Sequence, residues 1–401
     1  MRVASDDPNV HRLVTLIADT VTAEGGYVHP ELIVRHDGAS LWLELPRALN
    51  PHLVGADGKP LDKPHPDAAP LLVVPNGLHI PVSDLDWEPH DTRLRYRAQA
   101  EHLSSAQRTI LDAMVELFNT LDKVRVIGQA YAPHALENDP ELFALIRAAR
   151  PEFGTDNAKG RLPGEASPAL SVVNSRLRTE MGEAEEGPIG YFMPMIDMLN
   201  HHPYGSRYRR TDGGDWRIDI HHPEPDDQVF VRYNRADSLG VALGLGYLET
   251  ATRFVASVAC RVAVAGLGTI DVPGVSGQRR RLPAPTLNRT DDGWQVSALV
   301  LEPERLENLR TLLLMPLMSV QPDRGAAANL RSVDEFLAAV LEANTAYYER
   351  LLARCTPPFL VDSEPDLGAD PGQRALFAGV SAHQLHLLGN IAARLDALAS
   401  A

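Results

Sequence analysis

Cysteine and long apolar runs are scarce in this sequence, and each scarcity excludes a class of protein. The two cysteines, Cys260 and Cys355, cannot build a disulfide framework and have no partner at metal-ligand spacing, so we expect buried thiols in a reducing compartment. No window approaches eighteen consecutive apolar residues, which excludes a membrane-spanning helix. The N-terminus carries acidic residues before its short apolar stretch and has no small-residue cleavage site, unlike a signal peptide. These absences predict a cytoplasmic protein with no membrane partner.

Basic charge is also in short supply, since the net charge is −15 over 401 residues. A chain of this charge lacks the clustered basic surface that nucleic acid requires, so we expect no nucleic-acid partner. Acidity is compatible with a basic protein segment or a cationic small molecule as substrate, and equally with solubility alone. No G-x-G-x-x-G follows a strand, which argues against a Rossmann-type enzyme.

What remains is the composition of an ordinary globular protein, 44% hydrophobic and 23% charged, long enough for two or three domains. Apolar periodicity predicts an α+β chain that ends in helices. The expected elements are a helix over 10–23, a hairpin over 27–45, strand-like pieces within 71–98, helices over 104–119 and 141–149, turns at 203–206 and 212–215, strands over 216–220 and 228–233, strands within 252–300, and helices from 301 onward. We interpret residues from about 50 to 170 as a helical insertion between two halves of a split β core.

One stretch stands out for chemistry: 191–202, which reads YFMPMIDMLNHH. An apolar run ends abruptly in polar residues, so polar groups lie at the edge of something buried. Asp197 and His201 are four positions apart, which on a helical turn places both on one face, and Asn200 adds an amide beside them. The same pattern is also compatible with a buried polar network that binds no ligand.

The string PMIDMLNH resembles the D-x-x-N-H motif of SET-domain methyltransferases, in particular the subfamily of the Rubisco large-subunit lysine methyltransferase and the actin-histidine methyltransferase. Three other segments resemble the family in order: LIVRHDGASLWLELPRAL at 32–49, VNSRLR at 173–178, and QVFVRYNRADS followed by LGLGYLE at 228–249. The resemblance implies a SET-like domain over 1–250, a β-like connecting region over 251–300 and a helical substrate-binding-like domain over 301–401. It also implies a glycine-rich corner against the cofactor, which Gly25 and Gly26 match loosely.

The resemblance further implies S-adenosylmethionine-dependent methylation of an amine, with roles for particular residues. Tyr233 corresponds to the tyrosine that holds the amine and the methyl group in line. The implied cofactor-binding residues are Asn200, His201, Arg176 and Tyr247, with Arg176 pairing with the cofactor carboxylate. The implied substrate-channel residues are Asp197, Tyr208 and Leu245.

The sequence departs from the family at Leu245, which stands where a channel tyrosine is common, and at Leu239, where asparagine is common. An altered channel leaves the acceptor open among lysine, histidine, an amino terminus and an amine-bearing small molecule. Two other functions stay possible: a catalytically silent SET-like binding module, and a metalloenzyme using Asp197, His201 and one further histidine among His202, His221 and His222.

Overall fold

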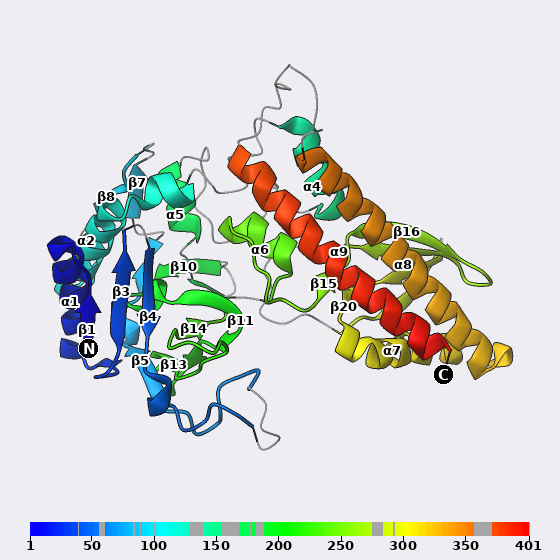
Figure 1. Cartoon of the computed structure of the whole chain (residues 1–401), viewed down its shortest axis with the longest axis horizontal. Coiled ribbons are helices and arrows are strands. Elements are labelled where there is room, and N and C mark those ends of the chain that lie inside the picture. The colour runs from blue at the N-terminus through cyan, green and yellow to red at the C-terminus, as the bar shows by residue number, and fades with distance from the viewer. Residues whose placement is uncertain are drawn as a thin grey trace. The chain divides into compact units, whose positions relative to one another are not determined.

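The computed structural model of the chain consists of two compact units. The first unit comprises 1–131 and 158–233, and the second comprises 132–157 and 234–401 (Figure 1). No helix within the described residues is both long and apolar enough to cross a membrane. The structure describes residues 1–38, 40–55, 61–82, 85–88, 90, 92–98, 102–128, 139–151, 153, 168–175, 178–181, 188–233, 235–274, 284–291, 293–356 and 371–400.

Two helices of the first unit, α1 (Pro8–Ala23) and α2 (Ser105–Thr120), pack against each other (Figure 1). Asp7 starts α1 by accepting hydrogen bonds from the first backbone N–H groups, and Pro8 fits the first turn because it needs no N–H partner there. Ser104 and Gln107 form a capping box at the start of α2, as its sequence predicts. Each helix buries one apolar face in the same core.

Short strands fill the rest of the first unit. The predicted hairpin is β3 (Ile33–Asp37) with β4 (Ser40–Glu44), and β1 (Arg2–Ala4) adds to it in parallel. A four-stranded sheet has the order β12 (Arg209–Arg210), β13 (Trp216–Asp219), β5 (Pro70–Val74) and β2 (Tyr27–Val28). A three-stranded sheet has the order β6 (Ile80–Pro81), β10 (Pro188–Phe192) and β9 (Arg178–Met181). Two further pairs are β7 (Leu85–Glu88) with β8 (Arg95–Ala98) and β11 (Asn200–Ser206) with β14 (Phe230–Val231). A helix, α5 (Pro168–Ser175), leads toward β9 along the chain.

Two expectations differ from this arrangement. The interval 50–170 is not simply a helical insertion, because β5 lies between β13 and β2 and buries Leu71, Leu72 and Val74. The turn predicted at 203–206 is wrong, since these residues belong to β11. Pro203 suggested a turn because proline lacks a ladder donor, but β11 pairs with β14 at residues 200, 201 and 206 with a register shift between, and such an irregularity accommodates proline.

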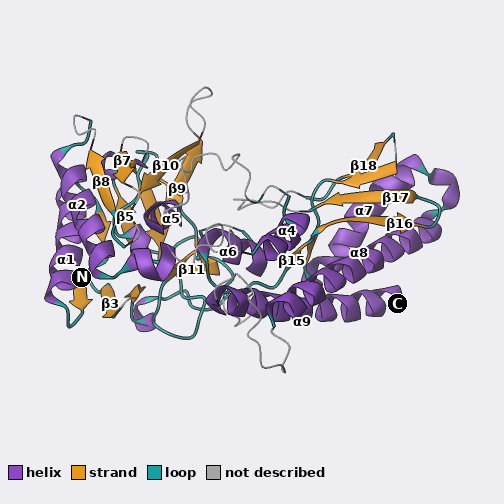
Figure 2. Cartoon of the chain, turned by 90° about the horizontal axis from the view of Figure 1, so that it is seen from above, coloured by secondary structure: helices purple, strands orange, loops and turns teal. Residues whose placement is uncertain are grey.

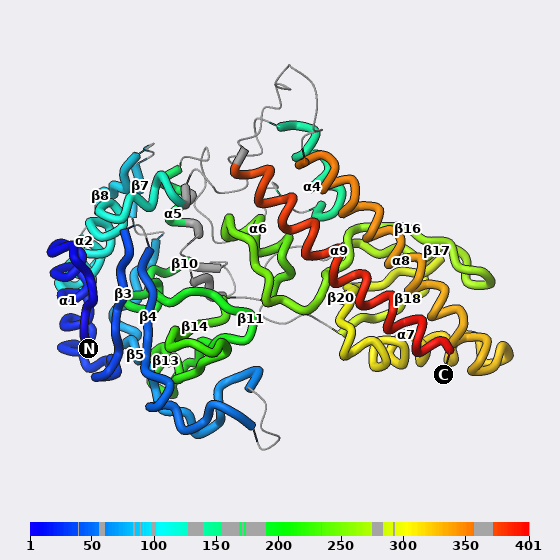
Figure 3. The backbone as a smooth tube through the Cα atoms, in the orientation of Figure 1, coloured from blue at the N-terminus to red at the C-terminus, as the bar shows by residue number. Residues whose placement is uncertain are grey.

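The second unit combines helices with a four-stranded sheet, so the predicted mixed fold with a helical C-terminal region is confirmed. The strands expected within 252–300 share one apolar core with the helices of this unit. Figure 2 shows the sheet beside α7 and α8, and Figure 3 shows α8 running alongside α9. The elements are α4 (Pro140–Ala149), α6 (Ser238–Leu245), β15 (Val255–Ala256), β16 (Ala259–Val264), β17 (Gly268–Pro273), β18 (Leu287–Thr290), β19 (Gly293–Val296), β20 (Val300–Leu301), α7 (Leu306–Val320), α8 (Ala326–Cys355) and α9 (Pro371–Ala399).

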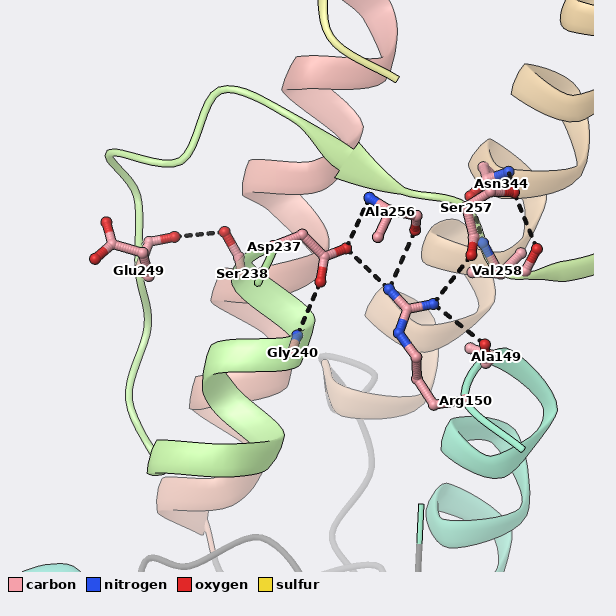
Figure 4. Close-up of polar contacts among 10 residues, drawn as sticks. All are labelled: Ala149, Arg150, Asp237, Ser238, Gly240, Glu249, Ala256, Ser257, Val258 and Asn344. Carbon is pink, nitrogen blue, oxygen red and sulfur yellow. Dashed lines mark hydrogen bonds and ion pairs between the residues drawn. The ribbon is translucent and has the colours of Figure 1, made fainter. Parts of the chain in front are cut away.

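A buried ion pair joins several elements of this unit (Figure 4). Asp237 caps α6 by accepting from the Gly240 N–H at 2.9 Å, and its other oxygen accepts from Arg150 at 2.9 Å and from the Ala256 N–H at 3.1 Å. Arg150, just after α4, also donates to the carbonyls of Ala149, Ala256 and Ser257. Both side chains are at most 4% exposed. The pair therefore holds α4, the start of α6 and β15 together with little contact with water.

We predict that Asp237→Asn destabilises the second unit by about 3–5 kcal/mol, because it leaves the Arg150 guanidinium buried without a counter-charge. Urea unfolding of the wild-type and Asp237→Asn proteins measures the loss of unfolding free energy. Asp271→Asn is the matched control, since the Arg261–Asp271 pair on the same unit is 61% and 45% exposed and its removal should cost under about 1 kcal/mol. Equal losses for the two variants would contradict the assignment.

Candidate functional site

The D-x-x-N-H segment folds as a short 3-10 helix that runs into a strand. The 3-10 helix η5 (Ile196–Met198) contains Asp197, and β11 begins at Asn200. The expectation that Asp197 and His201 share one face of a helical turn is therefore wrong, because the helix ends before Asn200. Met195, which precedes η5, has a φ of 63°, a conformation that costs a side-chain-bearing residue free energy. The segment thus turns sharply before it enters the sheet.

Strand β11 lies beside β14 (Figure 3), and their parallel pairing brings Tyr233 to the motif. Asn200 pairs with Phe230 and His201 with Val231, so Tyr233 follows two residues beyond the paired segment. The Tyr233 N–H donates to Nδ1 of His201 at 3.0 Å, and the two rings lie 5.2 Å apart. The Tyr233 hydroxyl donates to the Leu199 carbonyl. Residues more than thirty positions apart thereby converge.

A pocket of about 100 Å³ adjoins this convergence. Seven of its eleven lining residues are apolar, and its polar lining residues are Ser40, Lys123, Asp197 and Asn200. The apolar lining comprises Leu41, Met114, Leu117, Phe118, Leu121, Met195 and Met198. Leu199, whose carbonyl holds the Tyr233 hydroxyl, lies between two lining residues of η5 and β11. An apolar cavity with a few polar groups is the usual form of a small-molecule site.

Burial keeps His201 neutral. Desolvation, followed by the nearby His202, lowers the pKa of His201 to about 3. A neutral imidazole can accept the Tyr233 N–H at Nδ1, which a protonated imidazole cannot, because both of its nitrogens are then donors. The bond that fixes Tyr233 is therefore present across the ordinary pH range.

The remaining predicted residues are placed differently. Tyr208 packs edge-on against Trp216, with ring centroids 6.1 Å apart, and does not line the pocket. Leu245 ends α6 and Tyr247 follows it, both in the second unit. Arg176 lies outside the described residues. Of the eight predicted site residues, the structure thus brings together Asp197, Asn200, His201 and Tyr233.

The histidines proposed as metal ligands have other partners. Nε2 of His202 lies 2.9 Å from Glu224, and His222 contacts the Asn50 amide at 3.1 Å and the Leu45 carbonyl at 2.8 Å. Within the part of the chain that the structure describes, no three His, Cys, Asp or Glu residues form a group able to hold a metal ion. The geometry gives the metalloenzyme alternative no support.

Sequence reasoning missed the pocket residues outside the motif. Gly25 and Gly26 join α1 to β2 and do not line the pocket, whereas Ser40 and Leu41, just after the turn of the β3–β4 hairpin, do. The glycine of HDGAS was the available signal, since it marks a tight turn next to a strand. Lys123 gave no sequence signal, because a lysine after a helix is ordinarily exposed.

Comparison with known proteins gives one kind of match. No protein-family model matches the chain, and no curated protein matches it. Among solved structures, the chain is similar to the crystal structure of the SET domain of LSMT bound to lysine and AdoHcy, with 13% sequence identity and a TM-score of 0.41 over 97% of this chain and 92% of that chain. A similarity at this level assigns no residue and no reaction, so we base the proposal below on the residues of this chain.

We predict that Gly205→Ala weakens the β11–β14 pairing and destabilises the first unit by about 1–3 kcal/mol. A Cβ at Gly205 would lie 2.7 Å from the backbone carbonyl carbon of Val231 and 3.0 Å from that of Phe230, so the strands must separate. Chemical denaturation measures the change. Gly77→Ala, in the same unit, is the control, since a Cβ there meets nothing within 4 Å. A Gly205→Ala protein as stable as the control would show that the pairing tolerates the extra carbon.

We also predict that stability falls in acid through the buried histidines. A folded-state pKa of about 3 for His201, against 6.5 unfolded, gives stability that is fully present above pH 6.5 and is lost as the pH falls toward 3. His79 and His221, whose pKa values are lowered to about 4 by burial, act in the same direction. His201→Asn, which keeps an acceptor, should flatten the slope of unfolding free energy against pH between 6.5 and 4, and the exposed His11→Asn should not. Equal slopes in all three proteins would contradict this assignment.

Proposed function

We propose that this chain is an S-adenosylmethionine-dependent N-methyltransferase of the SET type. Its acceptor is an amine, either on a protein side chain, lysine or histidine, or on a small molecule. The observation that carries the proposal is the convergence of Tyr233 with Asn200 and His201 beside one pocket, the arrangement that the motif resemblance implies. The segments that resemble the family give only the order of these residues along the chain. Their convergence in space is a separate requirement for a common site.

The pocket suits part of such a cofactor. Its lining offers a lysine, a carboxylate, an amide and a hydroxyl on an apolar wall, a set that complements an amino-acid group attached to a thioether or sulfonium. When bound, S-adenosylmethionine supplies an activated methyl group on a positively charged sulfur. Asn200 and the backbone of the motif would hold it, and the hairpin would contribute Ser40 and Leu41 to the same pocket.

The hydrogen bonds of Tyr233 define what it can do for an amine. Because its proton is donated to the Leu199 carbonyl, the phenolic oxygen presents lone pairs to a neighbouring group. An N–H of a neutral amine can donate to that oxygen, which fixes the direction of the nitrogen lone pair. In-line displacement needs that alignment far more than it needs an acid or a base. His201 supports the geometry by holding the Tyr233 backbone.

The identity of the acceptor is part of the proposal. A protein lysine is the acceptor most typical of the resembled subfamily, and the departures of this sequence from that subfamily at Leu239 and Leu245 keep a histidine or a small amine among the proposed acceptors. A cytoplasmic location fits all of these acceptors. Methylation of candidate proteins or amines with radiolabelled S-adenosylmethionine identifies the acceptor directly.

We predict that Tyr233→Phe lowers the methyl-transfer rate by roughly 100-fold or more, because the substrate amine loses the oxygen that aligns it. Cofactor affinity, measured by calorimetry with S-adenosylhomocysteine, should change by less than about threefold. Tyr96→Phe is the matched control, since it removes only the hydroxyl contact to Asp112 at 2.5 Å on the surface of the same unit. Full activity in Tyr233→Phe would refute the role, and absence of cofactor binding by the wild-type chain would refute the proposed function. Cofactor binding without transfer to any acceptor would instead favour the silent binding module.

A further inference from the structure

The ionisable residues that line the pocket indicate which ligand group it suits. Among its lining residues, Lys123 and Asp197 are the two ionisable ones, and they come from segments more than seventy positions apart. Lys123 is only 9% exposed, an unusual degree of burial for a lysine. One cationic and one anionic side chain facing the same small cavity match a ligand that carries both charges.

Backbone strain marks the two segments that supply these side chains. Within the described residues, Asp122 and Met195 are the non-glycine residues with positive φ, at 51° and 63°. Asp122 ends the α2 region and lies between Leu121 and Lys123, both of which line the pocket, while Met195 lines it directly and precedes Asp197. Such conformations cost free energy and concentrate at binding sites, where the surrounding structure holds them. Both residues with positive φ thus lie at or next to lining residues of the same cavity.

The size of the cavity limits what it holds. An apolar cavity of about 150 Å³ can hold a benzene-sized molecule, so the observed volume of about 100 Å³ has room for a group of only a few heavy atoms. The charged end of an amino acid, its carboxylate and ammonium groups, is of about this size. A complete S-adenosylmethionine, which also carries a nucleoside, does not fit.

We infer that this pocket selects the α-amino-acid part of the ligand, with Lys123 as the residue that recognises its carboxylate and with Asp197 and Asn200 facing its ammonium group. Buried methionine, leucine and phenylalanine side chains, among them Met114, Leu117 and Phe118, would exclude water from these charged contacts. The inference rests on the proposed function and adds to it a specificity residue, Lys123, that lies outside every segment with a family resemblance. It gives Lys123 the carboxylate contact that the resemblance assigns to Arg176, a position outside the described residues.

Charge-assisted recognition of a carboxylate predicts a measurable preference. S-adenosylhomocysteine carries the amino-acid part, and 5′-deoxy-5′-methylthioadenosine lacks it but keeps the nucleoside and sulfur. The wild-type chain should bind S-adenosylhomocysteine at least roughly tenfold more tightly than methylthioadenosine, the ratio expected for a charged hydrogen bond.

The test is calorimetry of both ligands on wild type and variants. Lys123→Met, of similar length and apolar, should remove most of the preference and leave the affinity for methylthioadenosine within about threefold, while Lys123→Arg should retain much of it. Lys63→Met is the matched control at an exposed lysine of the same unit. Thermal melting verifies that each variant is folded, and Asp197→Asn provides a second variant, expected to weaken S-adenosylhomocysteine alone.

The outcomes separate the two proposals. If the wild type binds neither adenosyl compound, the proposed function fails. If it binds S-adenosylhomocysteine tightly and Lys123→Met keeps the same preference, the proposed function stands and the role of Lys123 is overturned. Equal weakening of both ligands in Lys123→Met would likewise overturn selective recognition of the carboxylate.

Discussion

The parallel pairing of β11 with β14 is the contact on which the candidate site depends. It involves few residues, Asn200 with Phe230 and His201 with Val231, and a later return at Ser206. Parallel neighbours need a connection that crosses over, and the chain between them makes β12 and β13 on the way. Gly205 lies against the β14 backbone, and its lack of a side chain lets the two strands approach closely. The same close approach positions Tyr233. The site is thus a product of sheet pairing more than of any single motif.

In the first unit, an uncharged buried histidine supports this strand pairing. In the second unit, a buried ion pair holds the neighbouring elements together. His201 is uncharged because desolvation disfavours the imidazolium, and only the neutral ring can accept the Tyr233 N–H. Arg150 and Asp237 instead form a buried ion pair, and each satisfies several backbone groups at the ends of α4, α6 and β15. The first unit therefore uses a buried neutral acceptor, and the second uses two buried side chains of opposite charge.

Local signals predicted most elements of this chain, and their failures have one physical origin. Apolar periodicity located α1 and α2, and the stripe of α8 that includes Leu337, Leu341 and Tyr348 is buried as its spacing predicts. The errors fall where long-range pairing decides the outcome. Pro203 lies in a strand, and β5, which falls in a region with predicted strand-like pieces, joins the sheet of β13 and β2 although it lies within the expected insertion. Order along the sequence indicated that Asn200 and Tyr233 belong together, but nothing local could place Ser40 or Lys123 beside them.

The positions of the strained residues explain why the pocket was harder to foresee than the motif. Asp122 and Met195 have positive φ, and both lie at the cavity: Lys123, which follows Asp122, lines it, and Met195 lines it directly. Without the turn at Asp122, a lysine that follows an amphipathic helix would be expected to extend into water, where its ammonium is best solvated. Its burial means that tertiary packing outweighs that preference at this point. Two residues beside one small cavity thus adopt conformations that cost free energy. The fold therefore specifies the cavity itself as well as the helix and the strand beside it.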